Sequence, residues 1–492
     1  MLINLVLSII ILTLSGFTKA DRDKINELYQ LTSAIQNHTS LVHGQWSLYV
    51  LDTETGKTII DINGQKSLAP ASNLKLVTSA VALSILGEEK QFTTSLEYTG
   101  VLNSYGILSG DLIINGEGDP TLGSSSFENA TPMDTLIDEW VQAIKSEGIK
   151  EIKGQIIGDD SYLDYMPVPP EYYWRDMGNY YAAGTSGLSI NENLYYLFFK
   201  PARVVGDEAI VIRTEPLVPG LTFINHMKTG PVGSGDNGFI YAAPWQYTHQ
   251  LEGTVPAGKK EFSIKGALPD PANFCAQLLH RRLSENGITI HGQPTTTRET
   301  NIPKKKRTIF YSVISAPLKD IVYMFNKRSV NFYGEQLIRI VGREIKGTGS
   351  LENGIEATEE WLEDKHIYTD GLFLHDGSGL SRANATPTRF LAELLDVVAS
   401  EPFFESYYNS LSIAGDPNDI GYMSDMCSGT SAAYNLRAKT GSINRVRAHS
   451  GYVRSKSNKL LSFSMIANEY VGSRGTVDRL HEKVMILLAE LP

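Results

Sequence analysis

Apolar and polar residues alternate over residues 46–62, on either side of a Glu-Thr-Gly-Lys turn at residues 54–57. This period of two, broken by a turn that contains glycine, predicts a β-hairpin near the start of the chain. Residues 68–72 (Leu-Ala-Pro-Ala-Ser) then lead into residues 73–86, which are rich in Leu, Val and Ala. This stretch predicts a helix that begins next to Ser72.

The pattern changes between residues 91 and 266, where short apolar runs recur between Gly, Pro, Asp and Asn. The runs at residues 112–114, 151–157, 209–213 and 261–264 are typical of short strands. Long helical patterns are few in this region, so it predicts one or two β-rich modules.

Helical spacing returns after Asp270, where Pro271 stands near the first position of a predicted helix. Residues 448–467 predict two strands joined by a polar turn, and residues 476–491 predict a closing helix. The simplest arrangement is an α+β fold. In it, a domain of helices and an antiparallel sheet is interrupted by the long β-rich insertion.

The composition adds bounds to this picture. A chain of 492 residues is long enough for two or three domains, and its net charge of −11 argues against a general nucleic-acid binder. The ten histidines are scattered and show no spacing typical of metal ligands. The only two cysteines, Cys275 and Cys427, could be bridged or free.

The first 20 residues differ from the rest. Residues 2–17 are almost wholly apolar, and Thr18-Lys19-Ala20 precede a charged stretch. This pattern predicts a signal peptide at residues 1–20 and an exported protein, periplasmic or otherwise. A cleaved signal would leave no stable membrane anchor; the alternative is an uncleaved N-terminal anchor.

Ser72 and Lys75 stand three positions apart at the start of the predicted helix, so their side chains lie on one face. A serine hydroxyl needs an adjacent base to become a nucleophile, and a lysine serves as that base when its pKa is lowered. The start of a helix also offers backbone N–H groups to an oxyanion. By itself, the same pair is far more typical of a capped helix followed by a surface lysine.

Two further short motifs follow along the chain. In Ser329-Val330-Asn331 a hydroxyl and an amide can point into one cleft, although an ordinary polar turn has the same residues. Residues 439–442 (Lys-Thr-Gly-Ser) precede a predicted strand. A lysine and a threonine there can bind a carboxylate, and the glycine lets substrate approach the backbone.

The three motifs, in this order, resemble the set found in penicillin-binding proteins and class A β-lactamases. The chain is similar to class C low-molecular-mass penicillin-binding proteins, the D-alanyl-D-alanine carboxypeptidase/endopeptidase family with its type-4 penicillin-binding proteins. The resemblance extends over residues 28–490 and includes residues 116–122, 158–161, 186–193, 253–256 and 376–382.

This resemblance implies a transpeptidase-like catalytic domain with a β-lactamase-like sheet and flanking helices, interrupted by inserted domains. The predicted limits are residues 26–90 plus 266–492 for the catalytic domain. Residues 91–190 plus 245–265 would form the second domain, and residues 191–244 a nested third domain.

The resemblance also implies a serine hydrolase that cleaves D-alanyl-D-alanine bonds of peptidoglycan stem peptides without a cofactor or metal, and that β-lactams acylate. Ser72 would be the nucleophile, Lys75 the base, kept deprotonated with the help of the cation at Lys439, and Ser329 the proton relay. The implied substrate-binding residues are Asn331, Lys439, Thr440, Gly441 and Ser442, with Asp160 and Arg382 as two further candidates for the cleft.

Two other functions remain open at this point. A β-lactamase-like hydrolase would need a deacylating glutamate, which cannot be placed, and a shorter chain between Lys75 and Ser329. A catalytically idle wall-binding protein would not need the intact motifs. The balance between carboxypeptidase and endopeptidase activity cannot be read from the sequence.

Overall fold

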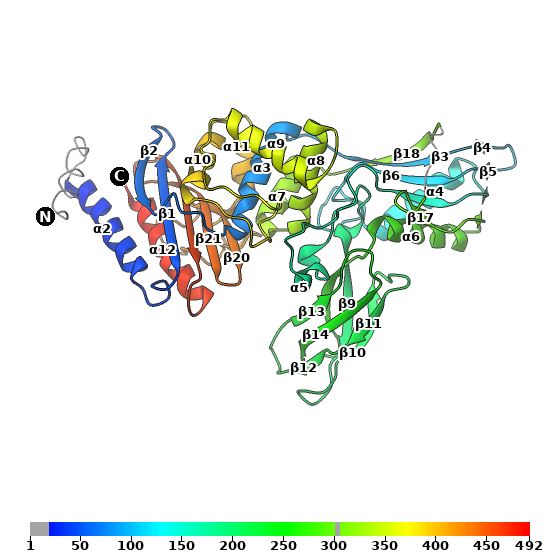
Figure 1. Cartoon of the computed structure of the whole chain (residues 1–492), viewed down its shortest axis with the longest axis horizontal. Helices are drawn as coiled ribbons and strands as arrows, with labels where there is room; N and C mark the ends of the chain where they lie inside the picture. The colour runs from blue at the N-terminus through cyan, green and yellow to red at the C-terminus, as the bar shows by residue number, and fades with distance from the viewer. Residues whose placement is uncertain (1–18, 301–305) are drawn as a thin grey trace.

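A computed structural model of the chain describes residues 19–300 and 306–492. The predicted signal peptide therefore lies almost wholly outside the described residues. Within them, no helix combines the length and the apolar character needed to span a bilayer. The molecule is elongated, and one β-rich unit projects from its side (Figure 1).

The first unit is built on a six-stranded antiparallel sheet, in the order β19-β20-β21-β22-β1-β2. Its strands are β1 (Gln45–Asp52), β2 (Lys57–Ile62), β19 (Ser412–Ile413), β20 (Arg437–Ile443), β21 (Val446–Arg454) and β22 (Leu460–Asn468). The predicted hairpin and the two predicted C-terminal strands are thus present as neighbours in one sheet. Segments far apart in the sequence therefore lie side by side in this sheet.

Helices cover both faces of this sheet (Figure 1). On one face α2 (Lys19–Gln36) packs beside α12 (Arg474–Glu490). The helix predicted at residue 476 begins at Arg474, because the Ser473 hydroxyl caps it by accepting from Thr476 N at 3.2 Å. The other face carries α10 (Thr388–Val398) and a helical layer of α3 (Lys75–Leu86), α7 (Leu318–Arg328), α8 (Asn331–Lys346), α9 (Leu351–Asp364) and α11 (Phe404–Ser410).

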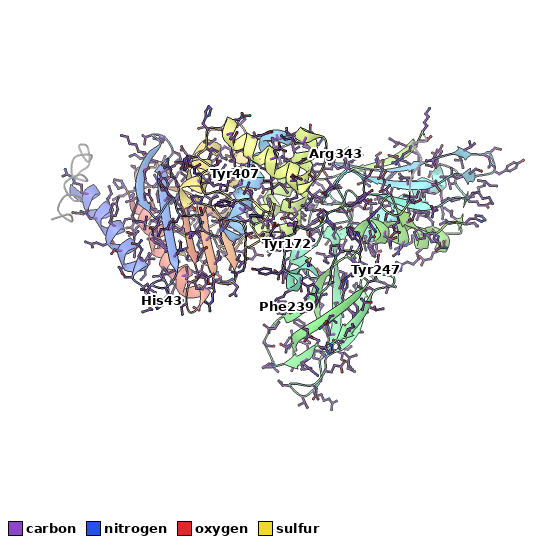
Figure 2. The ribbon with its side chains drawn as sticks, in the orientation of Figure 1. His43, Tyr172, Phe239, Tyr247, Arg343 and Tyr407 are labelled. Atoms are coloured by element: carbon purple, nitrogen blue, oxygen red, sulfur yellow. The ribbon has the colours of Figure 1, made fainter. Side chains whose placement is uncertain are left out.

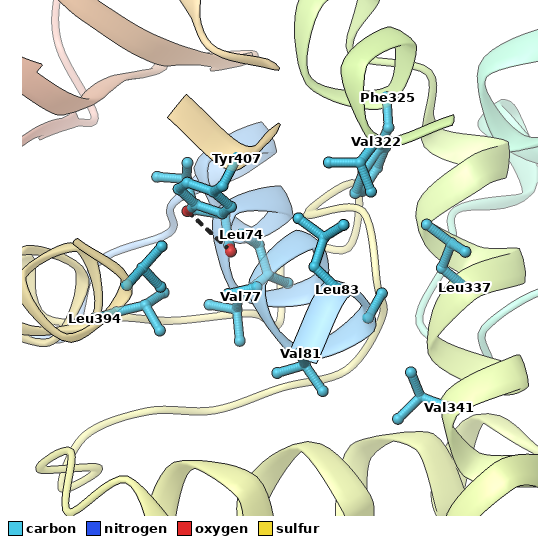
Figure 3. Close-up of a cluster of buried hydrophobic side chains, with 14 of the residues drawn as sticks. Leu74, Val77, Val81, Leu83, Val322, Phe325, Leu337, Val341, Leu394 and Tyr407 are labelled. Carbon is cyan, nitrogen blue, oxygen red and sulfur yellow. Dashed lines mark hydrogen bonds between the residues drawn. The ribbon is translucent and has the colours of Figure 1, made fainter. Parts of the chain in front are cut away.

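Helix α3 is the centre of that layer. It is apolar on all sides, and each of its residues from Lys75 to Leu83 is buried, as expected for a helix enclosed by others. Figure 3 shows its Val77 and Leu83 among side chains of α7, α8 and α10, and the Tyr407 hydroxyl donates to Leu76 O at 3.1 Å. This enclosure fixes the position of the helix that carries Lys75.

The second unit has two small sheets, with α4 (Met133–Ser146) and α6 (Pro271–Glu285) packed against them. Helix α6 begins as predicted, with Pro271 at its first position and Asp270 accepting from Asn273 N at 3.0 Å. The strands are β3 (Thr93–Tyr98), β4 (Val101–Leu102), β5 (Ile107–Ser109), β6 (Leu112–Gly116), β7 (Glu151–Ile152), β8 (Ile156–Asp159), β16 (Thr289–Ile290), β17 (Thr295–Thr296) and β18 (Thr308–Ile314).

The run at residues 151–157 was expected to be one strand, but it is split between the two sheets as β7 and β8. The break lies at Gly154, whose backbone N–H donates to Gly110 O at 3.0 Å. A Cβ at position 154 would stand 2.4 Å from that oxygen, so only glycine allows the chain to cross here.

The third unit is the projecting one, and it contains only short strands and turns besides α5 (Trp174–Met177), which packs on it. Its strands are β9 (Leu194–Lys200), β10 (Ile210–Glu215), β11 (Thr222–Asn225), β12 (Lys228–Gly230), β13 (Asn237–Tyr241), β14 (Thr248–Pro256) and β15 (Phe262–Ala267). The predicted α+β class with β-rich insertions is confirmed.

The predicted domain limits stay a prediction, and the strand pairing favours a different grouping. Strand β15 pairs with β9, which joins residues 194–267 in the third unit. Strands β16 to β18 extend the sheets of the second unit, so the chain returns to the first unit after Ile314 rather than at residue 266. The reason is pairing between strands far apart in sequence, which local patterns do not encode.

Candidate active site

Ser72 lies in a short 3-10 turn, η1 (Ala71–Leu74), directly before α3. The preceding residue, Ala71, has a left-handed φ of 48°. Gly379 packs against this turn, and a Cβ there would stand 1.9 Å from Ala71 O. Close backbone packing therefore holds Ser72 in place, while its side chain stays partly exposed in a cleft.

Lys75 is fully buried beneath Ser72. Its Nζ lies 3.1 Å from Ser72 Oγ, 2.6 Å from Asn331 Oδ1 and 2.5 Å from Ser378 O. A neutral amine has two N–H groups, which satisfy the amide and the carbonyl oxygen. Its lone pair is then left for the Ser72 hydroxyl, which is the geometry of a general base.

The electrostatics of Lys75 fit that role. Burial lowers its pKa to about 7, although the negative charges of Asp376 and Glu335 act in the opposite direction. We expected the cation at Lys439 to help keep Lys75 deprotonated. Burial is instead the main cause of the lowered pKa of Lys75. Burial also lowers the pKa of Lys439 well below the usual value, and the charges of Lys75 and Arg447 lower it further.

The second motif joins the third across the cleft. Ser329 follows the last residue of α7 in a left-handed conformation, with φ 56°. Its Oγ accepts a hydrogen bond from Lys439 Nζ at 2.9 Å. Asn331 begins α8, and its Nδ2 donates to Tyr181 O at 2.8 Å, in a short turn (η2, Tyr180–Ala182) of the segment that leads to the β-rich unit.

Strand β20 forms the opposite wall of the site. Strand β19 pairs only with its first two residues, Arg437 and Ala438, so no strand of the described chain covers that edge beyond them. Thr440 and Ser442 line the cleft. Gly441 stands where a Cβ would lie 2.6 Å from Pro70 O, which explains the glycine between them.

The cleft at Ser72 has a volume of about 1430 Å³ and runs between the catalytic motifs and the β-rich unit. Arg382 lines it, as predicted, and its guanidinium donates to Asn444 O. The other lining residues include Tyr173, Arg175, Asp176, Tyr180, Tyr181, Phe239, Lys265, Arg328, Tyr422 and Arg447.

The structure does not place Asp160 in this cleft. Asp160 lines a separate small cavity and accepts from Thr297 Oγ1 at 2.6 Å, and burial raises its pKa to about 6. The acids that line the cleft are Asp176 and Glu192, and Asp176 accepts from Tyr181 OH at 3.0 Å. Asp160 directly follows β8 and Asp176 lies in the short helix α5, and tertiary packing places only Asp176 in the cleft.

The sequence did not reveal the buried polar residues that lie near Lys75. Glu335 of α8 and Asp376 are fully buried there, with Tyr172 and Ser378 between them. The only signal was the segment at residues 376–382, which was recognised without a role for its first residues. Glu335 and Tyr172 lie in no motif.

The structure also bears on metal binding and on the two cysteines. Within residues 19–300 and 306–492, no group of three or more His, Cys, Asp or Glu side chains is arranged to hold a metal ion. Cys275 and Cys427 are both buried as free thiols, and burial raises the pKa of each thiol. This answers the question of a bridge that the sequence left open.

Comparison with known proteins agrees with the motifs. The chain is 28% identical to a D-alanyl-D-alanine carboxypeptidase of Actinomadura sp. (strain R39), over 94% of this chain and 85% of the relative. It is 24% identical to the D-alanyl-D-alanine carboxypeptidase DacB of Haemophilus influenzae, over 84% and 83% of the two chains.

Among solved structures, penicillin-binding protein 4 (dacB) of H. influenzae has the same fold. Its TM-score is 0.79 at 21% identity, over 94% of this chain and 99% of that one. The sequence model of the D-Ala-D-Ala carboxypeptidase 3 (S13) family matches residues 28–489. The resemblance inferred from the motifs is confirmed: the chain belongs to the D-Ala-D-Ala carboxypeptidase 3 (S13) family of serine-type peptidases.

Proposed function

We propose that this protein is a D-alanyl-D-alanine carboxypeptidase and D,D-endopeptidase that acts on peptidoglycan stem peptides through an acyl-enzyme at Ser72. The observation that carries the proposal is the contact between Lys75 Nζ and Ser72 Oγ at 3.1 Å. It joins a nucleophile that lines a cleft to a buried amine whose pKa is lowered to about 7.

The peptide substrate lies along the open edge of β20. Its C-terminal carboxylate is bound by Lys439 and the Thr440 hydroxyl, and Asn331 holds an amide of the stem peptide. Lys439 is buried and lies within hydrogen-bond distance of Ser329, so the carboxylate and the proton relay share one cation.

In the first half-reaction, Lys75 takes the Ser72 proton and the serine oxygen attacks the carbonyl carbon of the penultimate D-alanine. Backbone N–H groups of Ser72 and Ser442 stabilise the oxyanion, each contributing about 3–4 kcal/mol in comparable sites. The proton that Lys75 took is passed through Ser329 to the leaving nitrogen, and the peptide bond breaks. In the second half-reaction, water adds to the acyl-enzyme, and Ser72 regains its proton as the ester bond breaks.

The cleft also selects the stem peptide through its charged residues. Arg382 and Asp176 both line it and present opposite charges there. Asp176 takes the role that the sequence suggested for Asp160, which is to bind the cationic end of a diamino acid. Arg382 binds a carboxylate of the same peptide.

β-Lactams acylate Ser72 because they mimic the D-alanyl-D-alanine end. The penicillin-binding protein 4 (dacB) of H. influenzae, which has the same fold, has been solved in complex with a β-lactam. Such an enzyme meets its substrate outside the cytoplasmic membrane. We therefore also propose that the protein is exported, with residues 1–20 as its signal peptide.

The test uses defined muropeptides and mass spectrometry. Wild-type protein should release one alanine from a monomeric pentapeptide stem and cleave cross-linked dimers, whereas Ser72→Ala should do neither. Absence of both products with wild type would refute the proposal. Fast, sustained nitrocefin hydrolysis with intact muropeptides would indicate a β-lactamase instead.

A further inference from the structure

Glu335 lies in α8 one turn after Asn331, and its side chain is buried. One carboxylate oxygen accepts hydrogen bonds from Tyr172 OH at 3.0 Å and from Gly377 N at 3.1 Å. The other oxygen lies 3.2 Å from Nη1 of the buried Arg339. Three donors from three segments fix this carboxylate in one orientation.

The backbone of Gly377 and Ser378 (the Gly377–Ser378 peptide) connects Glu335 to Lys75. Its Gly377 N–H binds Glu335, and the Gly377 carbonyl accepts from Thr78 Oγ1 at 2.6 Å. The Ser378 carbonyl accepts from Lys75 Nζ at 2.5 Å. The orientation of the lysine amine therefore depends on where Glu335 holds this peptide.

Tyr172 adds a second support. Its hydroxyl lies 3.2 Å from Ser378 Oγ as well as 3.0 Å from Glu335 Oε1. It belongs to the segment that leads into the β-rich unit, and Figure 2 shows it where that unit meets the catalytic helices. The insertion thus contributes a buried side chain to the surroundings of Lys75.

Several charged or titratable groups face this cluster. Glu335 and Asp376 face Lys75 and raise its pKa against the effect of burial, and the charge of Lys75 in turn helps to lower the pKa of Lys439. Glu335 itself faces Asp376, Arg339 and Tyr172, and its pKa is raised to about 7 by burial and by Asp376. Both oxygens of Asp376 are bound within its own turn, by Gly379 N, Ser381 N and Asn384 Nδ2.

We propose that Glu335, supported by Tyr172, is a positioning residue for Lys75. It holds the Gly377–Ser378 peptide so that the Ser378 carbonyl directs the lysine amine toward Ser72 and Asn331. This inference rests on the proposed role of Lys75 as the base. Both oxygens of Asp376 accept hydrogen bonds from its own turn. Glu335 is therefore the acid whose hydrogen bonds join α8, the 376–381 turn and the β-rich insertion.

The test compares Glu335→Gln and Tyr172→Phe with Glu344→Gln, an exposed glutamate on the same helix. The readout is the pH profile of acylation by a fluorescent penicillin, per folded molecule. Small misplacements of catalytic groups are costly, so both buried variants should lower the plateau rate by about ten- to a hundredfold. In E335Q the midpoint of the acid limb should also move to lower pH, because a charge that raises the pKa of Lys75 is lost. E344Q should match wild type.

A second measurement needs no turnover. The titration of Lys75, followed by NMR in protein labelled at the lysine ε-carbon and assigned with Lys75→Arg, should have a lower midpoint in E335Q. A role confined to stability would reduce the melting temperature and leave both midpoints in place. That result, or an unchanged plateau and midpoint, would overturn the inference. If wild type is not acylated at all, the proposed function fails, and the NMR midpoint alone decides the inference.

Discussion

The buried ion pair between Lys327 and Asp419 lies close in sequence to Ser329, the proposed proton relay. Lys327 is the penultimate residue of α7, two residues before Ser329, and the charged side chains of Lys327 and Asp419 are only 1% and 2% exposed. Asp419 also accepts from Ile413 N at 3.1 Å and Gly421 N at 3.0 Å. We expect Asp419→Ala to leave a buried cation and two backbone donors without a partner.

The magnitude follows from this burial. Removing one partner of a buried ion pair costs about 3–5 kcal/mol, because the remaining charge is unpaired. The same helix provides a matched control in Lys319 and Glu89, whose side chains are 39% and 69% exposed. Solvent screens an exposed pair, so Glu89→Ala should change stability little.

The assay is urea unfolding followed by tryptophan fluorescence, together with the rate of penicillin acylation. Asp419→Ala should lower the free energy of unfolding by several kcal/mol more than Glu89→Ala and should also slow acylation, because Ser329 follows Lys327 closely. The double variant Lys327→Met with Asp419→Leu should recover much of the lost stability. Equal effects of the two alanine variants, or a double variant less stable than Asp419→Ala, would refute the reasoning.

Two other predictions concern the rate of acylation. Burial lowers the pKa of Lys75 to about 7, and only the neutral amine accepts a proton, so the acylation rate should rise with pH to a plateau, with a midpoint near 7. An acylation rate that falls with pH across this range in a stopped-flow measurement would contradict this prediction. Gly441→Ala should reduce the acylation rate by about tenfold or more while the protein stays folded, because the new Cβ would lie 2.6 Å from Pro70 O and displace the edge of β20. A wild-type rate constant for this variant in a penicillin-binding assay would contradict the prediction.

Local patterns were sufficient for the parts of the site that are close in sequence. Ser72 and Lys75 are three positions apart, so helical geometry alone brings them together. The hairpin of β1 and β2 and the paired β21 and β22 also follow from period-two alternation with a turn between. The meeting of Lys439 with Ser329 came from the family resemblance, since they are more than a hundred residues apart.

The remaining parts depend on tertiary packing. Glu335 reads in the sequence as one polar position of an amphipathic helix, and only the position of the 376–381 turn makes it part of the site. No periodic sequence pattern distinguishes Asp160 from Asp176, and only Asp176 lines the cleft. Likewise, the short strands β16 and β17 were not recognised, because two-residue strands have no periodicity to read.

The central claim is that Ser72 forms the acyl-enzyme, with its hydroxyl activated by Lys75. The most direct test is to incubate wild type, Ser72→Ala and Lys75→Arg with benzylpenicillin and to measure intact mass and the acylated peptide. We predict that wild type gains one penicillin on the peptide that contains Ser72, that Ser72→Ala gains none, and that Lys75→Arg is acylated far more slowly. Acylation of Ser72→Ala, or a wild-type adduct on a peptide without Ser72, would contradict the account.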